Sequence, residues 1–380
     1  MERISEVVGR LVLAGGVVAG RVTVEDRWIS RVEELPGDPA SATGPLIAPG
    51  FVDVHVHGWG GHAATGDASA LSGMARALLR RGVTSFLPTA PTLPEAEIPR
   101  FADTVRAWIP EAPSDGAAPL GFNLEGPFLA PGRKGAHDAA LLRTPADLEP
   151  GILDAALDGL RLMTIAPELP GALDLIARLA DEGIVASLGH SDATLDQAMA
   201  GYAAGATGTT HLFNAMSGID HRSPGLAVAA LATDAAWVEL IADGHHVHPA
   251  LWSLIARAKP ADRVVLVSDA LPIAGTGDGR GHVGALEVEV RDGRATLLNT
   301  ETLAGSVIAL DAAVRNLVRA GHPIQAAVAA ASSNPAGLLG ASDRGVIEQG
   351  RRAHLVELDD DLTVRRVTLG DAWIDGAAAG

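Results

Sequence analysis

The chain has 380 residues, enough for one large barrel with an appendage or for two to three smaller domains, because single cores stop growing near about 250 to 300 residues. Hydrophobic residues make up 47% against 20% charged, and no run of about 18 uncharged apolar residues occurs, which argues against disorder and a membrane span. The formal charge of −17 argues against a polyanion-binding surface, so we expect no nucleic acid partner.

The N-terminus, MERISEVVGRLVLAGG, carries acidic residues early and lacks a long apolar core followed by a cleavage site. We therefore expect a cytoplasmic protein that does not associate with membranes. The sequence contains no cysteine, so any transition metal must be held by His, Asp or Glu, and 13 histidines are present.

The first 48 residues carry short strand patterns broken by glycines. Between residues 51 and 270, apolar runs of strand length then alternate with amphipathic stretches of helix length. The expected strands cover residues 52–57, 84–88, 121–125, 161–165, 185–189, 208–212, 238–242 and 264–268. A helix is expected over 69–81, and another begins at a capping box formed by Thr194 and Gln197. Eight such units predict an α/β fold, a (β/α)8 TIM-like barrel.

A β-hairpin insertion is expected at about 283–299, around the turn at Asp292 and Gly293. The tail, residues 345–380, again carries short strand patterns. Each end of the chain is too small to bury a core alone. The sequence therefore predicts that residues 1–48 plus 345–380 form one small β-sandwich domain and that the barrel spans 49–344.

Polar residues occur where the expected barrel strands end, which is where active sites lie in this fold. They are His55, His57, Glu125, His190, His211, Asp243 with His245 and His246, and Asp269. Side chains two apart on a strand point the same way, so His55 and His57 can both face the barrel axis. Burying ionisable groups is costly unless they are paired or bind a metal. The pattern therefore predicts a metal site.

The segment from Pro49 to Gly58, PGFVDVHVHG, resembles the first-strand signature of the amidohydrolase superfamily, metal-dependent hydrolases on this barrel. Further matching motifs follow in order: Leu124 to Phe128, Lys134 to His137, Gly189 to Ser191, Thr210 to Met216, Ser223 to Gly225, Asp243-Gly244, Val267 to Ala270 and Leu303 to Ser306. Together they resemble the N-acetylglucosamine-6-phosphate deacetylase family from about residue 49 to 340. The resemblance implies hydrolysis of the N-acetyl group of N-acetylglucosamine 6-phosphate to glucosamine 6-phosphate and acetate.

The resemblance also implies that Glu125, His190 and His211 hold a divalent metal, the glutamate replacing the lysine-derived ligand of other amidohydrolases. His55 and His57, with bridging Glu125, are expected to form a second and weaker site, so each subunit binds one or two ions. Nitrogen and carboxylate ligands suit several metals. Zinc is expected, with iron, manganese and cobalt left open.

Two catalytic roles follow from the same resemblance. Asp269 is the candidate base that takes a proton from the attacking water and returns it to the sugar nitrogen as an acid. Asp269 could also complete the second metal site. His137 is expected to stabilise the oxyanion.

Phosphate binding is implied for two side chains. His246 would contact the phosphate within its own barrel, and Arg222 would reach in from a neighbouring subunit, which makes the active form a homodimer. Fixed guanidinium and imidazole donors bind phosphate without a basic overall surface. Backbone groups near Asn214 and Ala215 are expected to complete the pocket, with Ala136 as a further substrate contact.

Several alternatives stay open. The substrate could be the galactosamine epimer. The two sugars are distinguished at C4 by only one or two hydrogen bonds, and the sequence does not locate the residues that make them. A D-aminoacylase or a dihydroorotase is also conceivable, although the missing carboxylated lysine argues against the latter, and Lys134 to His137 with Arg222 favour a phosphosugar. A barrel that only binds is disfavoured, because the metal ligands and Asp269 are intact. His245 stands beside His246 and leaves the phosphate contact ambiguous by one residue.

Overall fold

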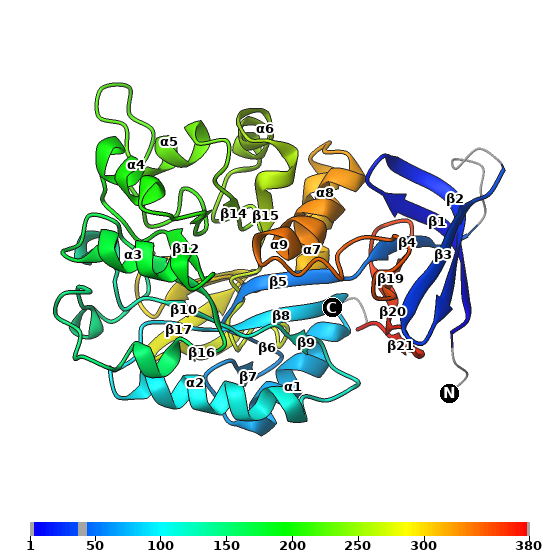
Figure 1. Cartoon of the computed structure of the whole chain (residues 1–380), viewed down its shortest axis with the longest axis horizontal. Coiled ribbons are helices and arrows are strands. Elements are labelled where there is room, and N and C mark those ends of the chain that lie inside the picture. The colour runs from blue at the N-terminus through cyan, green and yellow to red at the C-terminus, as the bar shows by residue number, and fades with distance from the viewer. Residues whose placement is uncertain (1–3, 37–43, 378–380) are drawn as a thin grey trace.

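The computed structural model describes residues 4–36 and 44–377 (Figure 1). The predicted domain made of 1–48 plus 345–380 includes 1–3, 37–43 and 378–380, which lie outside the described residues. A barrel forms one end of the molecule, and a smaller sheet built from both ends of the chain forms the other (Figure 1).

Eight parallel strands form the barrel, each overlapping one of the strands expected from the sequence. They are β5 (Phe51–Val56), β8 (Val83–Ala90), β10 (Phe122–Glu125), β11 (Leu160–Ile165), β12 (Val185–Leu188), β13 (Gly208–Thr209), β14 (Val238–Leu240) and β15 (Val264–Leu266). The first six pair in chain order, and β14 pairs with β15. Single backbone hydrogen bonds close the circle: Leu212 N donates to Glu239 O (2.8 Å), and Asp269 N donates to His55 O (2.8 Å). The predicted (β/α)8 barrel is confirmed.

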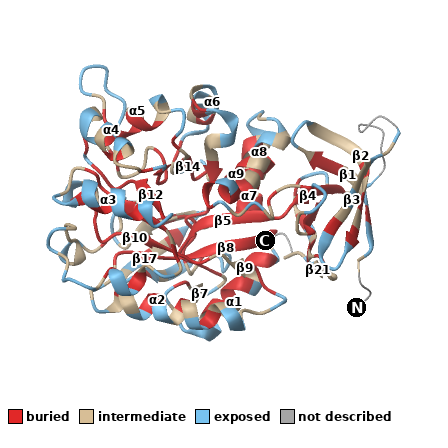
Figure 2. Cartoon of the chain, viewed as in Figure 1, coloured by how far each residue is buried: buried red, intermediate tan, exposed pale blue. Residues whose placement is uncertain are grey.

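Helices cover the outside of the barrel and bury their inward faces (Figure 2). They are α1 (Ala68–Leu79), α2 (Glu97–Trp108), α3 (Ala172–Asp181), α4 (Leu195–Ala203), α5 (Leu226–Ala232), α6 (Pro249–Ala258), α7 (Leu310–Arg319), α8 (Ile324–Ala331) and α9 (Ser333–Leu338). Between β10 and β11 the described chain holds three short 3-10 turns in place of an α-helix: Pro131–Arg133, Ala139–Leu141 and Asp154–Ala156. This long connection carries His137 to the mouth of the barrel.

Local sequence signals explain where two of these helices begin and end. Helix α4 starts with the predicted capping box, in which Thr194 Oγ1 accepts from Gln197 N (3.3 Å) and Gln197 Oε1 accepts from Thr194 N (2.9 Å). Helix α1 starts at Asp67, whose carboxylate accepts from Ala70 N (2.9 Å). It ends just before Gly82, which adopts a φ of 80° that suits glycine.

The small sheet joins strands from both ends of the chain. Its order is β21-β20-β19-β4-β1-β2-β3, with β1 (Glu6–Leu13), β2 (Gly16–Glu25), β3 (Trp28–Glu34), β4 (Leu46–Pro49), β19 (His354–Leu358), β20 (Val364–Leu369) and β21 (Trp373–Asp375). Strand β4 pairs with β1 on one side and with β19 on the other. The sheet curls around one apolar core that includes Leu11, Ile29 and Leu355. At its far edge, Ile29 N donates to Arg351 O (2.8 Å), so β3 returns to the segment ahead of β19.

A three-stranded antiparallel sheet follows the last barrel strand. Strands β17 (Leu286–Arg291) and β18 (Arg294–Leu297) flank the turn at Asp292 and Gly293, and β16 (Gly279–Val283) adds a third strand to the expected hairpin. Both turn residues have positive φ, 52° and 73°, as a two-residue hairpin turn requires. Val288 of this sheet and Leu271 belong to one apolar cluster, so the sheet lies beside the loop that follows β15 at the mouth of the barrel.

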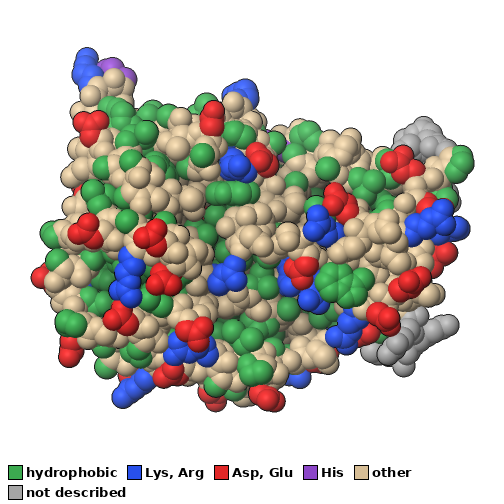
Figure 3. All heavy atoms as spheres, in the orientation of Figure 1, with side chains coloured by type: hydrophobic (Ala, Val, Ile, Leu, Met, Phe, Trp, Pro, Cys, Tyr) green, Lys and Arg blue, Asp and Glu red, His purple; other side chains and the backbone are tan. Residues whose placement is uncertain are grey.

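Three two-residue strands complete the fold: β6 (Gly58–Trp59), β7 (His62–Ala63) and β9 (Ala118–Pro119). None of the helices in the described part of the chain combines the length and the apolar character needed to cross a bilayer. On the face shown in Figure 3, acidic and basic side chains are interspersed, and the described basic residues gather into no patch there.

Candidate active site

Glu125, at the end of β10, is the centre of the site. Its side chain is buried, and Oε1 lies 3.0 Å from His190 Nε2 and 2.9 Å from His211 Nε2. Oε2 lies 3.2 Å from His57 Nε2 and 3.2 Å from His137 Nε2. One carboxylate therefore faces four imidazole rings that come from separate barrel elements.

Two triads within this group have the spacing of a metal site. Glu125 with His190 and His211 forms one, and Glu125 with His55 and His57 forms the other. In each triad, the potential ligand atoms all lie within 4.8 Å of one another. The structure thus brings together both ligand sets expected from the sequence, with Glu125 shared between them.

The contacts made by Nδ1 indicate which ring nitrogen His57 and His190 each present to Glu125. His57 Nδ1 lies 3.1 Å from Thr89 O, and His190 Nδ1 lies 2.8 Å from Arg133 O. A carbonyl oxygen only accepts, so in each neutral ring Nδ1 carries the proton and Nε2 presents its lone pair. Lone pairs and carboxylate oxygens then point at one another, an arrangement that a cation stabilises.

His137 has the opposite arrangement. Thr92 N donates to His137 Nδ1 (3.2 Å), so that nitrogen is the acceptor and Nε2 carries the proton. Burial lowers the pKa of His137 to about 4, which keeps the ring neutral at pH 7. His137 is therefore a hydrogen-bond donor toward Glu125, while His57 and His190 are suited to bind a metal.

Further contacts support a cation at this position. Nε2 of His190 and Nε2 of His211 lie 3.1 Å apart. Within the described residues, the buried His55 Nε2 has no hydrogen-bond partner. Imidazole nitrogens and a carboxylate that point toward one another form the kind of ligand set that binds a divalent transition metal. The residues present fit such an ion.

The carboxylates of the site are anionic. Burial opposes ionisation of Glu125, but interactions with His137 and His55 outweigh it and hold its pKa well below the usual range. Burial likewise opposes ionisation of Asp269, but with no metal bound the protonated form of His57 donates to it, and this hydrogen bond and the charge of His55 lower the pKa of Asp269 to about 2. Two buried negative charges call for compensating positive charge, which protonated histidines or a metal can provide.

Asp269 follows β15 and lies beside the second triad. Its Oδ1 is 3.2 Å from His57 Nε2 and 3.6 Å from His55 Nε2. Asp269 has a φ of 50°, and His190 and His211, at two other strand ends, have φ of 47° and 27°. Left-handed backbone at residues other than glycine is strained and clusters at functional sites.

A cavity of about 470 Å³ opens above these residues. Its lining includes these predicted site residues: His57, Glu125, Ala136, His137, His190, His211, Asn214, Ala215 and Asp269. His246 also lines this cavity, while His245 lines a neighbouring hollow. His55 lies beneath the cavity, fully buried.

His246 is paired with a buried carboxylate. Its Nδ1 lies 2.7 Å from Asp243 Oδ2. Burial opposes protonation of His246, but the hydrogen bond to Asp243 outweighs it and raises the pKa of the ring. The raised pKa favours the protonated imidazole, and that form at the cavity wall suits an anionic group of a ligand.

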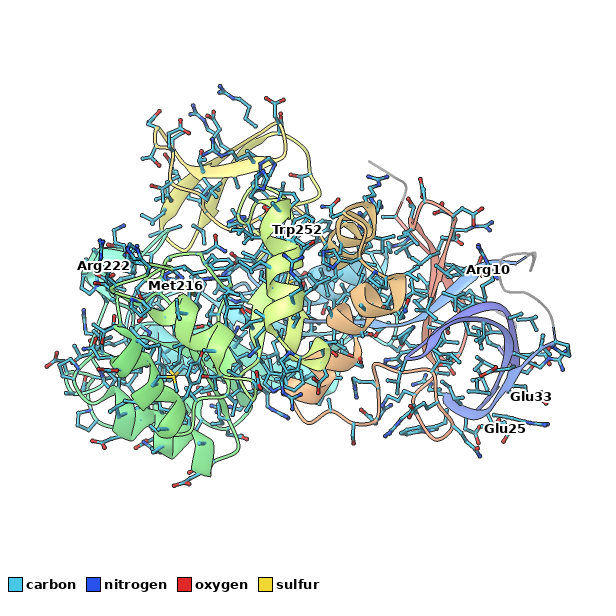
Figure 4. The ribbon with its side chains drawn as sticks, turned by 90° about the horizontal axis from the view of Figure 1, so that it is seen from above. Arg10, Glu25, Glu33, Met216, Arg222 and Trp252 are labelled. Atoms are coloured by element: carbon cyan, nitrogen blue, oxygen red, sulfur yellow. The ribbon has the colours of Figure 1, made fainter. Side chains whose placement is uncertain are left out.

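Arg222 lies apart from the other predicted site residues. It is exposed in the loop between α4 and α5, where its backbone N donates to Asp220 Oδ1 (2.8 Å). Figure 4 shows it at the outer edge of the barrel end, and it does not line the cavity of its own chain. One copy of the chain therefore does not place Arg222 against the site.

Sequence reasoning missed several residues that hold or line the site. Glu239, in β14, is buried and accepts from His55 Nδ1 (3.1 Å); a charged residue inside the apolar run 238–242 was the available signal. Arg294, in β18, and Glu301, in the segment that follows β18, also line the cavity. Thr89 acts through its backbone carbonyl, which no side-chain pattern reveals.

The model of the amidohydrolase family matches residues 46–376. The chain is 38% identical to an N-acetylgalactosamine-6-phosphate deacetylase of Escherichia coli O157:H7, over 94% of both chains. It is also 38% identical to an N-acetylglucosamine-6-phosphate deacetylase of Bos taurus, over 92% of this chain and 88% of that protein. An N-acetyl-D-glucosamine-6-phosphate deacetylase variant of Mycobacterium smegmatis, solved with N-acetyl-D-glucosamine 6-phosphate, is 35% identical, with a TM-score of 0.88 over 97% of this chain and 98% of that one. These matches confirm the resemblance found in the sequence, and the chain belongs to the amidohydrolase family.

Proposed function

We propose that this protein hydrolyses the N-acetyl group of N-acetylglucosamine 6-phosphate to glucosamine 6-phosphate and acetate. The observation that carries the proposal is the convergence of four imidazole rings on Glu125 at the base of a cavity that also holds Asp269 and His246. An amide needs a strong nucleophile, a polarised carbonyl and a proton for the departing amine, and this set contains a candidate for each. The relatives named for this reaction support the substrate.

A divalent metal fits both triads, with Glu125, His190 and His211 at one and His55 and His57 with shared Glu125 at the other. When bound, such an ion lowers the pKa of water and polarises a carbonyl oxygen. We propose one or two ions per subunit, with the His55 and His57 site the weaker. Zinc is the expected metal, and iron, manganese and cobalt suit the same ligands.

Asp269 is proposed as the general base and then the general acid. Its carboxylate is anionic, lines the cavity, and lies 3.2 Å from His57 Nε2 of the second triad. It takes a proton from the attacking water and gives it to the sugar nitrogen as the C–N bond breaks. His137 is proposed to stabilise the oxyanion, because its protonated Nε2 is a fixed donor on a buried side chain that lines the cavity.

The phosphate end of the substrate is assigned to His246, with backbone groups of Asn214 and Ala215 and the adjacent Ala136 completing the pocket. The raised pKa of His246 supports a phosphate contact. Arg222 is proposed to enter this pocket from a partner subunit, because it is exposed and does not line the cavity of its own chain. The active form is then a homodimer. A cytoplasmic location remains a prediction.

N-acetylgalactosamine 6-phosphate is a second candidate substrate, favoured by the identity to the Escherichia coli relative named for that epimer. The two sugars differ only in the configuration at C4, so the same metal and phosphate contacts serve both. The other amidohydrolase reactions considered from the sequence find no support in the relatives reported above.

Free-amine release from N-acetylglucosamine 6-phosphate tests the proposal, beside N-acetylgalactosamine 6-phosphate and unphosphorylated N-acetylglucosamine. Each assay uses metal-stripped and zinc-restored protein. Zinc-dependent hydrolysis of the first compound alone supports the proposal, and equal rates on the epimer broaden it to both hexosamines. Failure on both phosphosugars by protein that holds zinc overturns the substrate assignment.

A further inference from the structure

Glu239 is a buried carboxylate that the proposed mechanism leaves unused. It lies in β14 between Val238 and Leu240, both buried, and its own side chain is 2% exposed. A buried carboxylate is costly unless hydrogen bonds or charges compensate it. Its contacts therefore indicate what the charge does.

The Oε2 atom of Glu239 contacts one member of each metal triad. It accepts a hydrogen bond from His55 Nδ1 (3.1 Å) and another from the backbone N of His211 (3.1 Å). Its Oε1 has no hydrogen-bond partner in the described part of the chain. A single oxygen thus connects a ligand of the Glu125, His55 and His57 triad to the backbone of a ligand in the other triad.

The contact to His55 differs from those of the other ligand rings. His57 and His190 donate from Nδ1 to backbone carbonyls, whereas His55 donates to a side-chain carboxylate. A carboxylate behind a metal-binding histidine fixes the tautomer and makes the ring a stronger ligand than a carbonyl does. The other ring nitrogen of His55, Nε2, has no hydrogen-bond partner among the described residues. His55 belongs to the second triad, where this nitrogen is free to bind a metal.

We propose that Glu239 is a positioning residue that makes His55 a metal ligand and thereby sets the occupancy of the second site. The contact to His211 N also holds the left-handed backbone at that residue, where φ is 27°. The proposal rests on the metal sites of the proposed function and is independent of the substrate. Metal binding measures it directly, so a failure of the deacetylase assignment does not affect the test.

The experiment measures zinc stoichiometry and affinity by competition with a chelating dye, on full-length protein stripped of metal and refilled. Glu239→Gln keeps the shape and the acceptor oxygen for His211 N but removes the charge. It should lower zinc affinity at the second site by about 10- to 100-fold, so that only one of the two ions is still held tightly. Zinc affinity at the first site should stay within about threefold of that of the parent protein. Wild-type affinities at both sites in this variant would overturn the proposal.

A matched control is Glu357→Gln in β19, also a buried carboxylate, which pairs with Arg366 (2.7 Å) in the small sheet. It should leave both zinc affinities unchanged. His55→Gln removes the ligand itself and should reproduce the loss at the second site. Adding Glu239→Gln to it should cause no further loss, because both changes act through one contact.

Two further outcomes decide against the proposal. Additive losses in the double variant would show that Glu239 acts through the fold and not through His55. Equal losses of zinc affinity at the two sites would also show that Glu239 acts through the fold. If Glu239→Gln does not fold, Glu239→Asp keeps the charge but shortens its reach, and it must show the same selective loss.

Discussion

The Nε2 atoms of His190 and His211 lie 3.1 Å apart, and both face the same oxygen of Glu125. His190 Nδ1 faces a backbone carbonyl, so its Nε2 carries the lone pair in the neutral ring. Two ring nitrogens and a carboxylate oxygen at this spacing are best satisfied by a shared cation. This relationship is the basis of the metal predictions below.

Removal of the metal should abolish hydrolysis, and zinc should restore it. The apoprotein should also unfold at a lower temperature, because an ion that binds only the folded state at 100 times its Kd stabilises that state by about 2.7 kcal/mol. Amine release and a thermal melt, each with and without zinc, measure both effects. A chelated protein that retains full activity would contradict a metal-dependent mechanism.

Replacing Asp269 with Asn should abolish turnover and leave zinc bound at the first site, because the change removes the proton acceptor but no ligand of that triad. We expect a fall in kcat of at least about 1,000-fold, near the upper range for a general base. Metal content is measured on the same sample. A rate within about tenfold of the parent would show that another group transfers the proton.

His137 and His190 should respond differently to the same substitution. His137→Asn should lower kcat by about 100- to 1,000-fold with zinc content unchanged, because it removes an oxyanion donor. His190→Asn should lose zinc from the first site as well as activity. Loss of zinc in the His137 variant would make that residue a ligand and not a donor.

Arg222→Ala should raise KM for the phosphorylated substrate strongly and leave unphosphorylated N-acetylglucosamine unaffected, because only the phosphate contact is removed. Arg291→Ala is the matched control: it is also an exposed arginine, with 74% of its side chain accessible, and it lies outside the main cavity. Steady-state kinetics of both variants on both substrates distinguish the loss of a phosphate contact from a general loss of activity. Equal losses on both substrates would rule out a phosphate role.

His354, in β19, should make the small sheet sensitive to acid. Burial and the positive charges of Arg344 and Arg352 lower its pKa to about 3, from 6.5. The unfolded chain therefore binds a proton that the folded chain does not, and stability is lost as pH falls from about 6.5 toward 3, by up to about 1.4 kcal/mol per pH unit. Urea unfolding of metal-free protein at pH 7.5, 6.5 and 5.5 should show a steeper loss in wild type than in His354→Gln. Parallel losses would assign the acid sensitivity to other groups.

Much of the barrel was predictable from local pattern. Each expected strand overlaps an observed one, and the capping box at Thr194 and Gln197 forms as expected, because both signals depend on residues close together in the chain. The alternation of His55 and His57 on β5 also placed both rings on one face. The third strand of the sheet after the barrel was not expected, since β16 (Gly279–Val283) is rich in glycine and lacks a strand pattern.

The sequence by itself determined the order of the eight barrel strands and the polar residues at their ends. Only the tertiary structure decided which atoms meet. Glu239 and His55 are 184 residues apart, and their contact exists because closing the barrel brings β14 and β5 around one axis. Likewise, the tautomers of His57, His137 and His190 depend on a carbonyl or amide supplied by a distant segment. The periodicity of a sequence predicts which face of a helix or strand a side chain occupies, whereas its hydrogen-bond partners depend on how the elements pack together.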